Sequence, residues 1–362
     1  MAISLFVIQV IFSLLSNQAS ILVASIKLNS QHLGMGGFET PLDWERLREL
    51  RQIFLGEKKT EQDYWDSYET LDCYDRTFAQ RIGWKWDFAL SEIKKSGWEP
   101  MPRSIVCDLA CGTGIAGRSF LHAFCENSIQ SIHYSDRSTS AQKYSEDRHI
   151  ESFNDISLSA EFPGREALFL ISHIGTEIAG SEVEKIISLL KAKAYGFIWV
   201  EPGAFNTGRM LSQIREKLLD EFAPWAPCPS NASCPILSSS HWDDWCHQFA
   251  KPPSGIFQDA FWAQFSKELK VDLRSLPVSF LCMDRRSAVR RIDIGRFLGR
   301  PHINKYQVEI QTCTGGCLKR LNILKRNHPE LYKAFRKDNF ESLSKIIEEG
   351  GEIKQCSDPH PK

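Results

Sequence analysis

Short apolar runs that alternate with amphipathic stretches constrain this 362-residue chain more than any other feature. Four strand-like runs stand at Ser104–Leu109, Ser131–Tyr134, Ala167–Ile171 and Tyr195–Val200. Segments with a helical period separate them. Apolar strands alternating with helices predict βαβ units, and hence an α/β fold whose parallel sheet is covered on both faces. We expect Leu276–Met283 and Gln307–Thr312 to form an antiparallel pair that completes this sheet.

A glycine-rich turn joins the first strand to its helix. Gly112, Gly114 and Gly117 match a bare dinucleotide fingerprint. The sequence Asp-Leu-Ala-Cys-Gly-Thr-Gly at Asp108–Gly114, however, resembles motif I of class I S-adenosylmethionine (SAM)-dependent methyltransferases, whose ligand has no pyrophosphate. Asp136 closes the second strand, where that resemblance implies a partner for ribose hydroxyls. The resemblance implies these SAM contacts: Asp108, Ala110, Gly112, Gly114 and Asp136.

The segment after the Ala167–Ile171 run offers no familiar catalytic motif. It reads Ser172-His-Ile-Gly-Thr-Glu177, without the Pro-Pro-Tyr-like motif of amino-methylating enzymes and without a cysteine that could act as a cytosine-C5 nucleophile. His173 and Glu177 are the candidate acid or base. The competing interpretation is that His173 is a structural histidine beside a strand end.

Cysteines form a second group of candidate residues. The chain has eleven, an odd number spread over its length, which favours a reducing compartment over a disulfide framework. Cys228, Cys234 and Cys246 lie close together on segments rich in proline, and such loops suit either zinc or an iron–sulfur cluster. The gaps are wider than a zinc knuckle, which favours a cluster. Four residues could supply a fourth ligand: His247, Cys282, Cys313 and Cys317. Reduced cysteines without a metal are the alternative.

Several of these segments occur in one order that is more specific than any single motif. The glycine loop, Val200-Glu-Pro-Gly203, the two Cys-Pro pairs, Asp244-Trp-Cys-His247 and Val308–Thr314 together resemble the Rsm22 family, the small-ribosomal-subunit methyltransferase-like proteins of bacteria and mitochondria. The resemblance runs from about Glu61 to Lys337. It implies a class I methyltransferase fold, a [4Fe–4S] cluster and association with the small ribosomal subunit or its rRNA. Carried over by position, the implied cluster ligands are Cys228, Cys234, Cys246 and Cys313.

Charge is unevenly distributed along the chain. The total is only −1, but residues 285–337 contain fourteen Lys and Arg against three acids, a net charge of 14 − 3 = +11. Clustered basic residues neutralise phosphates, so this segment is a candidate RNA-binding region; the alternative is an ordinary solvated face. The candidate RNA contacts are Arg290, Arg291, Lys319, Arg320, Lys325 and Arg326.

These patterns predict a division into segments. We expect a leader or a mis-assigned start over 1–34, an N-terminal helical region over 35–100, a SAM-binding core over 101–222, a Cys-rich cluster-binding insertion over 223–250, terminal strands with the basic segment over 251–340, and a tail over 341–362. The many aromatics of the helical region favour a cap packed on the core over an RNA-stacking surface. The apolar run Ile3–Ile26 is interrupted by polar residues, so no membrane anchor is expected.

The sequence therefore predicts a cytoplasmic, monomeric, SAM-binding and [4Fe–4S]-containing rRNA methyltransferase-like protein that acts on the small ribosomal subunit in assembly or translation. One alternative is a non-catalytic ribosome assembly factor with a vestigial SAM pocket. Another is a zinc-containing methyltransferase of small molecules.

Overall fold

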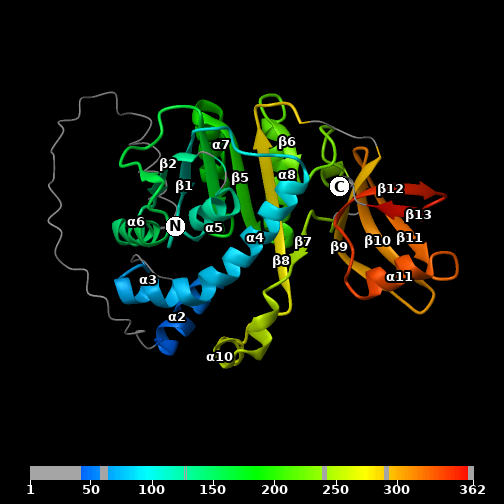
Figure 1. Cartoon of the computed structure of the whole chain (residues 1–362), viewed down its shortest axis with the longest axis horizontal. Coiled ribbons are helices and arrows are strands. Elements are labelled where there is room, and N and C mark those ends of the chain that lie inside the picture. The colour runs from blue at the N-terminus through cyan, green and yellow to red at the C-terminus, as the bar shows by residue number, and fades with distance from the viewer. Residues whose placement is uncertain are drawn as a thin grey trace.

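The computed structural model describes residues 42–57, 64–125, 127, 129–238, 243–288 and 293–357. They form an α/β body and a β-barrel that lie side by side, with the barrel at the C-terminal end (Figure 1). The predicted leader lies outside the described residues, as do Arg290 and Arg291.

An eight-stranded mixed sheet forms the centre of the α/β body. Its order is β3-β2-β1-β4-β5-β8-β6, with β7 also paired to β8. Strands β1 to β5 are parallel, and β8 runs antiparallel between β5 and β6. The strands are β1 (Ser104–Leu109), β2 (Ile129–Ser135), β3 (Ser157–Leu158), β4 (Ala167–Ser172), β5 (Ala194–Pro202), β6 (Ala223–Ala226), β7 (Gln248–Ala250) and β8 (Leu276–Asp284). This order and the reversed β8 confirm the predicted α/β methyltransferase-like fold.

Helices cover both faces of the sheet because alternate strand residues point to opposite sides. Leu168 and Leu170 of β4 belong to one apolar core, whereas Phe169 and Ile171 belong to the other. The connecting helices are α5 (Ile115–Ala123), α6 (Thr139–Ser152), α7 (Gly180–Lys193) and α8 (Phe205–Leu218). The long α4 (Gln80–Lys95) runs across the front of the sheet in Figure 1. The body is therefore a three-layer sandwich with two separate cores.

The described part of the N-terminal region is helical. It comprises α2 (Trp44–Phe54), α3 (Tyr68–Tyr74), the π-helical turn Asp75–Ala79 and α4 (Gln80–Lys95). Side chains at Asp43 and Ser67 accept hydrogen bonds from the first backbone amides of α2 and α3, which fixes where both helices begin. Aromatic side chains of this region pack against one another, edge-to-face in the pairs Tyr64–Trp65 and Trp65–Tyr74.

Between β6 and β8 the chain forms short elements, and after β8 it forms the barrel. The short elements are α9 (Pro235–Ser238), the 3-10 turn Ser254–Gln258 and α10 (Ala260–Leu269). The barrel contains β9 (Ile294–Ile303), β10 (Gln307–Thr314), β11 (Cys317–Leu324), α11 (Pro329–Arg336), β12 (Leu343–Glu349) and β13 (Glu352–Ser357). Its strands close in the order β10-β11-β13-β12-β9 around an apolar interior.

The barrel corrects two expectations. Gln307–Thr312 does not pair with β8 at the edge of the sheet; as β10 it pairs with β9 and β11 instead. The expected tail over 341–362 is ordered through residue 357, where β12 and β13 bury Leu343, Ile346 and Ile353 inside the barrel. Among the described residues, no helix combines the length and apolar character needed to cross a membrane.

Candidate functional site

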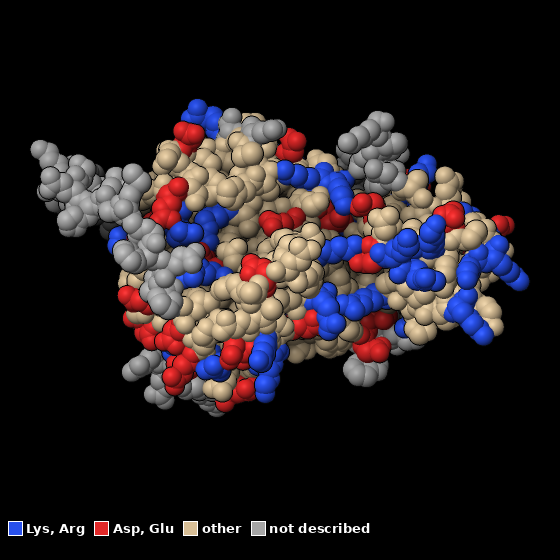
Figure 2. Space-filling model, turned by 60° about the horizontal axis from the view of Figure 1, so that its bottom comes forward, with Lys and Arg blue, Asp and Glu red and all other residues tan. Residues whose placement is uncertain are grey.

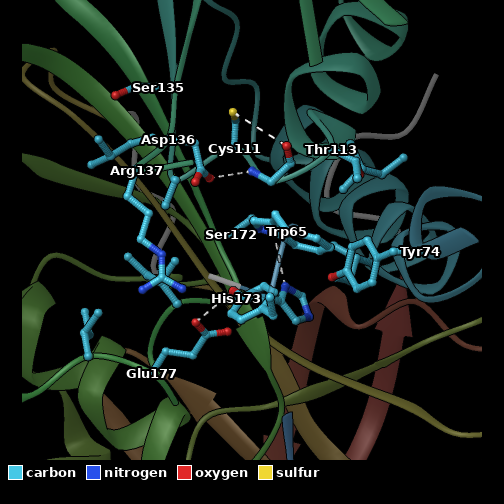
Figure 3. A pocket seen from close by; sticks show the side chains of 18 of the residues that line it. Trp65, Tyr74, Cys111, Thr113, Ser135, Asp136, Arg137, Ser172, His173 and Glu177 are labelled. Carbon is cyan, nitrogen blue, oxygen red and sulfur yellow. Dashed lines mark hydrogen bonds between the residues drawn. The ribbon is translucent and has the colours of Figure 1, made fainter. Parts of the chain in front are cut away.

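A pocket lies at the carboxyl edge of the sheet, where the glycine loop turns from β1 into α5. Gly112 and Gly114 have φ values of +54° and +75°. Asp136, which follows β2, accepts hydrogen bonds from the backbone amides of Gly112 and Ser138, both at 2.9 Å. Ala110, Gly112, Thr113 and Asp136 line the pocket. The loop and the second acidic residue, inferred separately from sequence, therefore meet in one place (Figure 3).

Asp108 lies beneath this loop and is fully buried. Its Oδ2 accepts a hydrogen bond from the amide of Gly117 at 2.8 Å, while Oδ1 has no hydrogen-bond partner. Burial raises the pKa of Asp108 to about 8. Asp108 does not line the pocket, so its position is that of a residue supporting the loop from below.

Aromatic residues of the N-terminal region form another wall of the pocket. Tyr64, Trp65 and Tyr74 line it, and Trp65 lies 4.7 Å from Tyr64 and 4.8 Å from Tyr74 between ring centroids. Figure 3 shows Arg137 and Glu177 on one side of the pocket and Thr113 and Tyr74 on the other. From the sequence, these aromatic residues are expected only in a helical cap that packs on the core. Their role as pocket walls depends on how α3 docks beside the glycine loop.

The segment after β4 closes the pocket and is held by α4. Ser172 and His173 line the pocket. The indole Nε1 of Trp86 donates to Ser172 Oγ at 2.9 Å, and Lys85 Nζ lies 3.2 Å from His173 Nε2. His173 Nδ1 lies 3.2 Å from Ser172 Oγ. Both ring nitrogens of His173 are therefore engaged by the protein, and burial lowers the pKa of His173 well below its ordinary value.

Lys85 and Glu201 were not anticipated as parts of this site. Lys85 is only 9% exposed, and burial lowers its pKa to about 7. Glu201 Oε1 accepts hydrogen bonds from the backbone amides of Ile174 and Gly175 and from the Trp199 indole, which fixes the turn after β4. Burial raises the pKa of Glu201 to about 7. In the sequence, only the motif Val200-Glu-Pro-Gly203 draws attention to Glu201, and no motif draws attention to Lys85.

Glu177 lies at the mouth of the pocket. Its Oε2 accepts a hydrogen bond from Tyr64 Oη at 3.2 Å, and the guanidinium of Arg137 lies 5.3 Å from the centre of the Tyr64 ring. Unlike His173, Glu177 is exposed. Both acid–base candidates line the pocket, and Glu177 is the more exposed of the two.

A second pocket gathers four cysteines between the α/β body and the barrel. Cys228, Cys234, Cys246 and Cys313 all line it. Of the four residues considered for a fourth ligand, only Cys313 does so. Among the described residues, no group of three or more His, Cys, Asp or Glu side chains is arranged closely enough to hold a metal ion. The four cysteines thus share a pocket without a ready coordination shell.

Arg215 of α8 holds the cysteine loop in place. Its Nε donates to Cys228 Sγ at 3.2 Å, and its Nη2 donates to the carbonyl oxygens of Ser230 and Ala232 at 2.9 and 2.7 Å. Arg215 and Arg296 both line the pocket and are almost completely buried. Both guanidiniums therefore lie at the cysteine pocket, where Arg215 is also paired with Glu216 and Arg296 with Glu92.

The candidate RNA contacts that the structure describes lie on the barrel. Lys319 pairs with Glu348 at 2.6 Å, whereas Arg320, Lys325 and Arg326 are exposed and form no ion pair with any described residue. Figure 2 shows Lys and Arg gathered over the barrel at the right of the molecule. Not every basic residue of 285–337 lies on this basic surface, because Arg296 is buried in an ion pair with Glu92.

The sequence of this chain matches the model of a known protein family. The model of the family described as mitochondrial small ribosomal subunit Rsm22 matches residues 86–342. The chain belongs to the Rsm22 family. The matched range includes the glycine loop, the turn after β4 and all four cysteines of the second pocket. Because the family is named for a mitochondrial ribosome, the cytoplasmic location expected from the cysteines remains a prediction.

Other comparisons place this Rsm22 member among distant structures. A Pyrococcus horikoshii protein proposed to be an RNA methyltransferase is 12% identical, covering 66% of this chain and 98% of its own, with a TM-score of 0.35. The plantazolicin methyltransferase BamL, solved with SAH, is 10% identical, covering 67% of this chain and 97% of its own, with a TM-score of 0.35. The Geobacter metallireducens precorrin-6y C5,15-methyltransferase is 10% identical, covering 56% of this chain and 87% of its own, with a TM-score of 0.33. No curated protein matches. The fold assignment therefore depends on the strand order above.

Proposed function

We propose that this Rsm22 member binds SAM in the pocket at the sheet edge and acts on the rRNA of the small ribosomal subunit, as a monomer. The observation that carries the proposal is the glycine loop held against Asp136 at the carboxyl edge of the sheet, where α/β folds bind their ligands. A side chain at Gly112 would point toward Trp65 and fill part of that space. When bound, SAM would supply an activated methyl group.

The residues around the pocket suggest how it would orient a ligand. Asp136 lines the pocket, and its carboxylate oxygens can accept hydrogen bonds from ribose hydroxyls beyond those from the two amides. Tyr64, Trp65 and Tyr74 would enclose the ligand and exclude water. Glu177 at the mouth is the group placed to hold or accept a proton from an incoming substrate.

A non-catalytic role is the second candidate, and one observation favours it. His173 cannot easily serve as a base, because both ring nitrogens are engaged and its pKa is lowered. Methyl transfer then depends on Glu177 or on the substrate alone. A protein that retained SAM binding without turnover would still bind the ribosomal subunit, as the assembly-factor alternative requires.

Calorimetry and radiolabelling separate these two functions. The wild type should bind SAM and transfer a labelled methyl group to immature small subunits, and Asp136→Ala should lose both activities. Asp155→Ala, at an exposed acid outside the pocket, is the matched control. Binding that is lost with Asp136 but never accompanied by transfer would favour the assembly factor. SAM binding unaffected by Asp136→Ala would contradict the proposed pocket.

We also propose that the second pocket holds a [4Fe–4S] cluster on Cys228, Cys234, Cys246 and Cys313. Four thiolates are the usual ligand set of such clusters. Arg215 lines the pocket and donates to Cys228 Sγ, so it can stabilise the negative charge of a four-thiolate centre. All four ligands come from the protein, which leaves no open position for substrate chemistry. The cluster would therefore be structural and join the barrel to the α/β body.

Metal analysis of anaerobically purified protein tests the cluster. About four irons per chain are expected, with the brown colour of an iron–sulfur protein. Cys313→Ala should reduce the iron content strongly, whereas Cys317→Ala, four residues further on and outside the pocket, should leave it unchanged. Stoichiometric zinc without iron, or equal iron in both variants, would contradict the proposal.

A further inference from the structure

The barrel has an architecture that the sequence did not reveal. Its five strands close into a Greek-key barrel, with α11 placed between the third and fourth strands. Neighbouring strands are antiparallel except for β11 and β13, which run parallel. This is the architecture of an OB-fold, which binds oligonucleotides on the face of its second and third strands and on the loops that follow its first and fourth strands.

Part of that face is already covered within this chain. The second and third strands of the barrel are β10 and β11. On their outer surface, Gln311 Nε2 donates to Asp244 Oδ1 at 2.7 Å, and Cys313 and Leu318 pack against Ile236 of the cysteine-rich segment. The end of the barrel that carries the cysteine pocket is therefore not available to a ligand. The opposite end of the same two strands remains open.

At this open end, the turn between β9 and β10 meets the turn after β11. The amide of Lys325 donates to the carbonyl of Tyr306 at 2.9 Å, and Tyr332 Oη donates to the carbonyl of Asn304 at 2.7 Å. Asn304 Oδ1 accepts hydrogen bonds from the amides of Tyr306 and Gln307. The turn that carries Tyr306 is thus anchored at several points before any ligand binds.

Tyr306 presents an aromatic ring to solvent among cations. The residue is 66% exposed, and Lys305 Nζ lies 4.7 Å from the ring centre. The backbone of Lys325 meets that of Tyr306 in the adjoining turn, Lys325 Nζ lies 5.4 Å from the centre of the Tyr332 ring, and Arg326 is the next residue and is exposed. No carboxylate of a described residue lies within ion-pair distance of Lys305, Lys325 or Arg326, so their charges are not neutralised locally. We call these four residues, Lys305, Tyr306, Lys325 and Arg326, the barrel-end platform.

We propose that the barrel-end platform binds single-stranded RNA, with one unpaired base stacked on the ring of Tyr306 and the adjacent phosphates contacting Lys305, Lys325 and Arg326. An aromatic ring flanked by cations is how single-strand-binding OB-folds hold a chain without reading its sequence. In a duplex the bases are already stacked on each other, so the ring would have no base to receive. This inference deepens the proposed function, because it identifies unpaired rRNA as the form that the protein holds.

Fluorescence anisotropy with the full-length protein tests the platform. The probe is a fluorescein-labelled single-stranded RNA of roughly 12 nucleotides, within the site size of an OB-fold, and the same strand in a duplex is compared. The wild type should bind the single strand more tightly than the duplex. Tyr306→Ala should weaken binding roughly 5- to 100-fold, whereas Tyr306→Phe should bind like the wild type because it keeps the ring. Phe257→Ala removes another exposed aromatic and should change nothing.

The basic residues are tested through salt dependence. Lys325→Gln should make the plot of log affinity against log salt shallower by about 0.7, the loss expected for one single-strand phosphate contact. Lys267→Gln, at an exposed lysine of α10, is the control. Duplex binding as tight as single-strand binding, or unchanged affinity in Tyr306→Ala, would overturn the inference.

SAM binding measured on the same preparations separates this inference from the proposed function. If RNA binding depends on Tyr306 but SAM does not bind, the platform stands and the methyltransferase pocket fails. If SAM binds and small subunits are bound, but the single strand is not, the pocket stands and the platform fails.

Discussion

Buried titratable residues lie next to the sheet-edge pocket. Lys85 reaches from α4 to His173 at the end of β4, and it does so with little access to water. Burial favours the neutral amine and lowers the pKa of Lys85 to about 7, against about 10.4 for a free lysine. Lys85 therefore changes charge near neutral pH beside the residue that closes the pocket.

This lowered pKa predicts a specific pH dependence of stability. Below pH 7 Lys85 is protonated in both the folded and unfolded chains, so the full cost of burying its charge is present. As the pH rises above 7, the folded chain loses this proton before the unfolded chain does. The free energy of unfolding should then rise by up to about 1.4 kcal/mol per pH unit from this group.

Denaturant titrations of Lys85→Met and the wild type between pH 7 and 8.5 measure this contribution. The free energy of unfolding of the wild type minus that of Lys85→Met should increase by roughly 1 to 2 kcal/mol over this pH range. Lys267→Met, which changes an exposed lysine, should run parallel to the wild type. Parallel curves for Lys85→Met would mean that Lys85 does not titrate in this range.

Residues of this kind could not be found from the sequence. Lys85 and His173 belong to segments far apart in the chain, and nothing near Lys85 marks it as buried except its position between Trp84 and Trp86. Asp136 could be predicted because its distance from the glycine loop is fixed by one strand–helix–strand unit. Local spacing thus locates residues within a βαβ unit, but it does not reveal contacts between units.

At the scale of elements, the glycine loop combines two different requirements. A Cβ at Gly114 would lie 2.9 Å from Ser145 Cβ in α6, which is closer than real contacts allow. A Cβ at Gly112 would meet only Trp65, at 3.9 Å across the pocket. Gly114 is therefore needed for packing α5 against α6, whereas the missing side chain of Gly112 leaves space in the pocket.

The two glycines predict different effects of the same substitution. Both Gly112→Ala and Gly114→Ala incur about 1–2 kcal/mol from the left-handed backbone, but Gly114→Ala adds the clash with Ser145. Gly114→Ala should therefore lower the melting temperature more. Gly112→Ala should weaken SAM binding more than its loss of stability explains. Calorimetry and thermal melts of both variants measure this, and the opposite ranking would contradict these roles.

Elements were predicted unevenly along the chain. The buried parallel strands were recognisable as continuous apolar runs, because both of their faces are covered. The barrel strands alternate instead: Val308 and Ile310 point inward, while Glu309 and Gln311 lie on the outer side. This alternation predicts a strand over Gln307–Thr312, but it does not show that the strand pairs within a barrel and not at the edge of the sheet. Closure of the barrel joins β9 to β12, a long-range pairing that no local pattern records.

For the whole molecule, the contact between the α/β body and the barrel matters most. Arg296 of β9 donates to the carbonyl of Pro227 and forms a buried ion pair with Glu92 of α4. Burial opposes ionisation of Glu92, but Arg296, Ser342 and Lys95 outweigh it and hold the pKa of Glu92 below its ordinary value. The two bodies are therefore joined by a buried charge pair as well as by the cysteine pocket.

Breaking this charge pair should destabilise the folded chain. Arg296→Met leaves Glu92 buried without its main partner and should lower the free energy of unfolding by about 3 kcal/mol. Adding Glu92→Leu should restore part of this loss, because the unpaired charge is removed. Lys354→Met breaks a surface pair with Glu352 and should cost under about 1 kcal/mol. Chemical denaturation of the four proteins tests the ranking, and a loss for Arg296→Met equal to that for Lys354→Met would refute it.

The position of Cys313 has a consequence for how the protein is made. Three of the pocket cysteines come from one stretch before β8, but the fourth is on β10, which the ribosome synthesises later. A nascent chain that ends before β10 carries only three of these thiols and cannot complete a four-thiolate centre. If the pocket is filled as proposed, insertion of the cluster must wait until most of the chain has been translated. A filled site would then distinguish finished molecules from prematurely terminated ones.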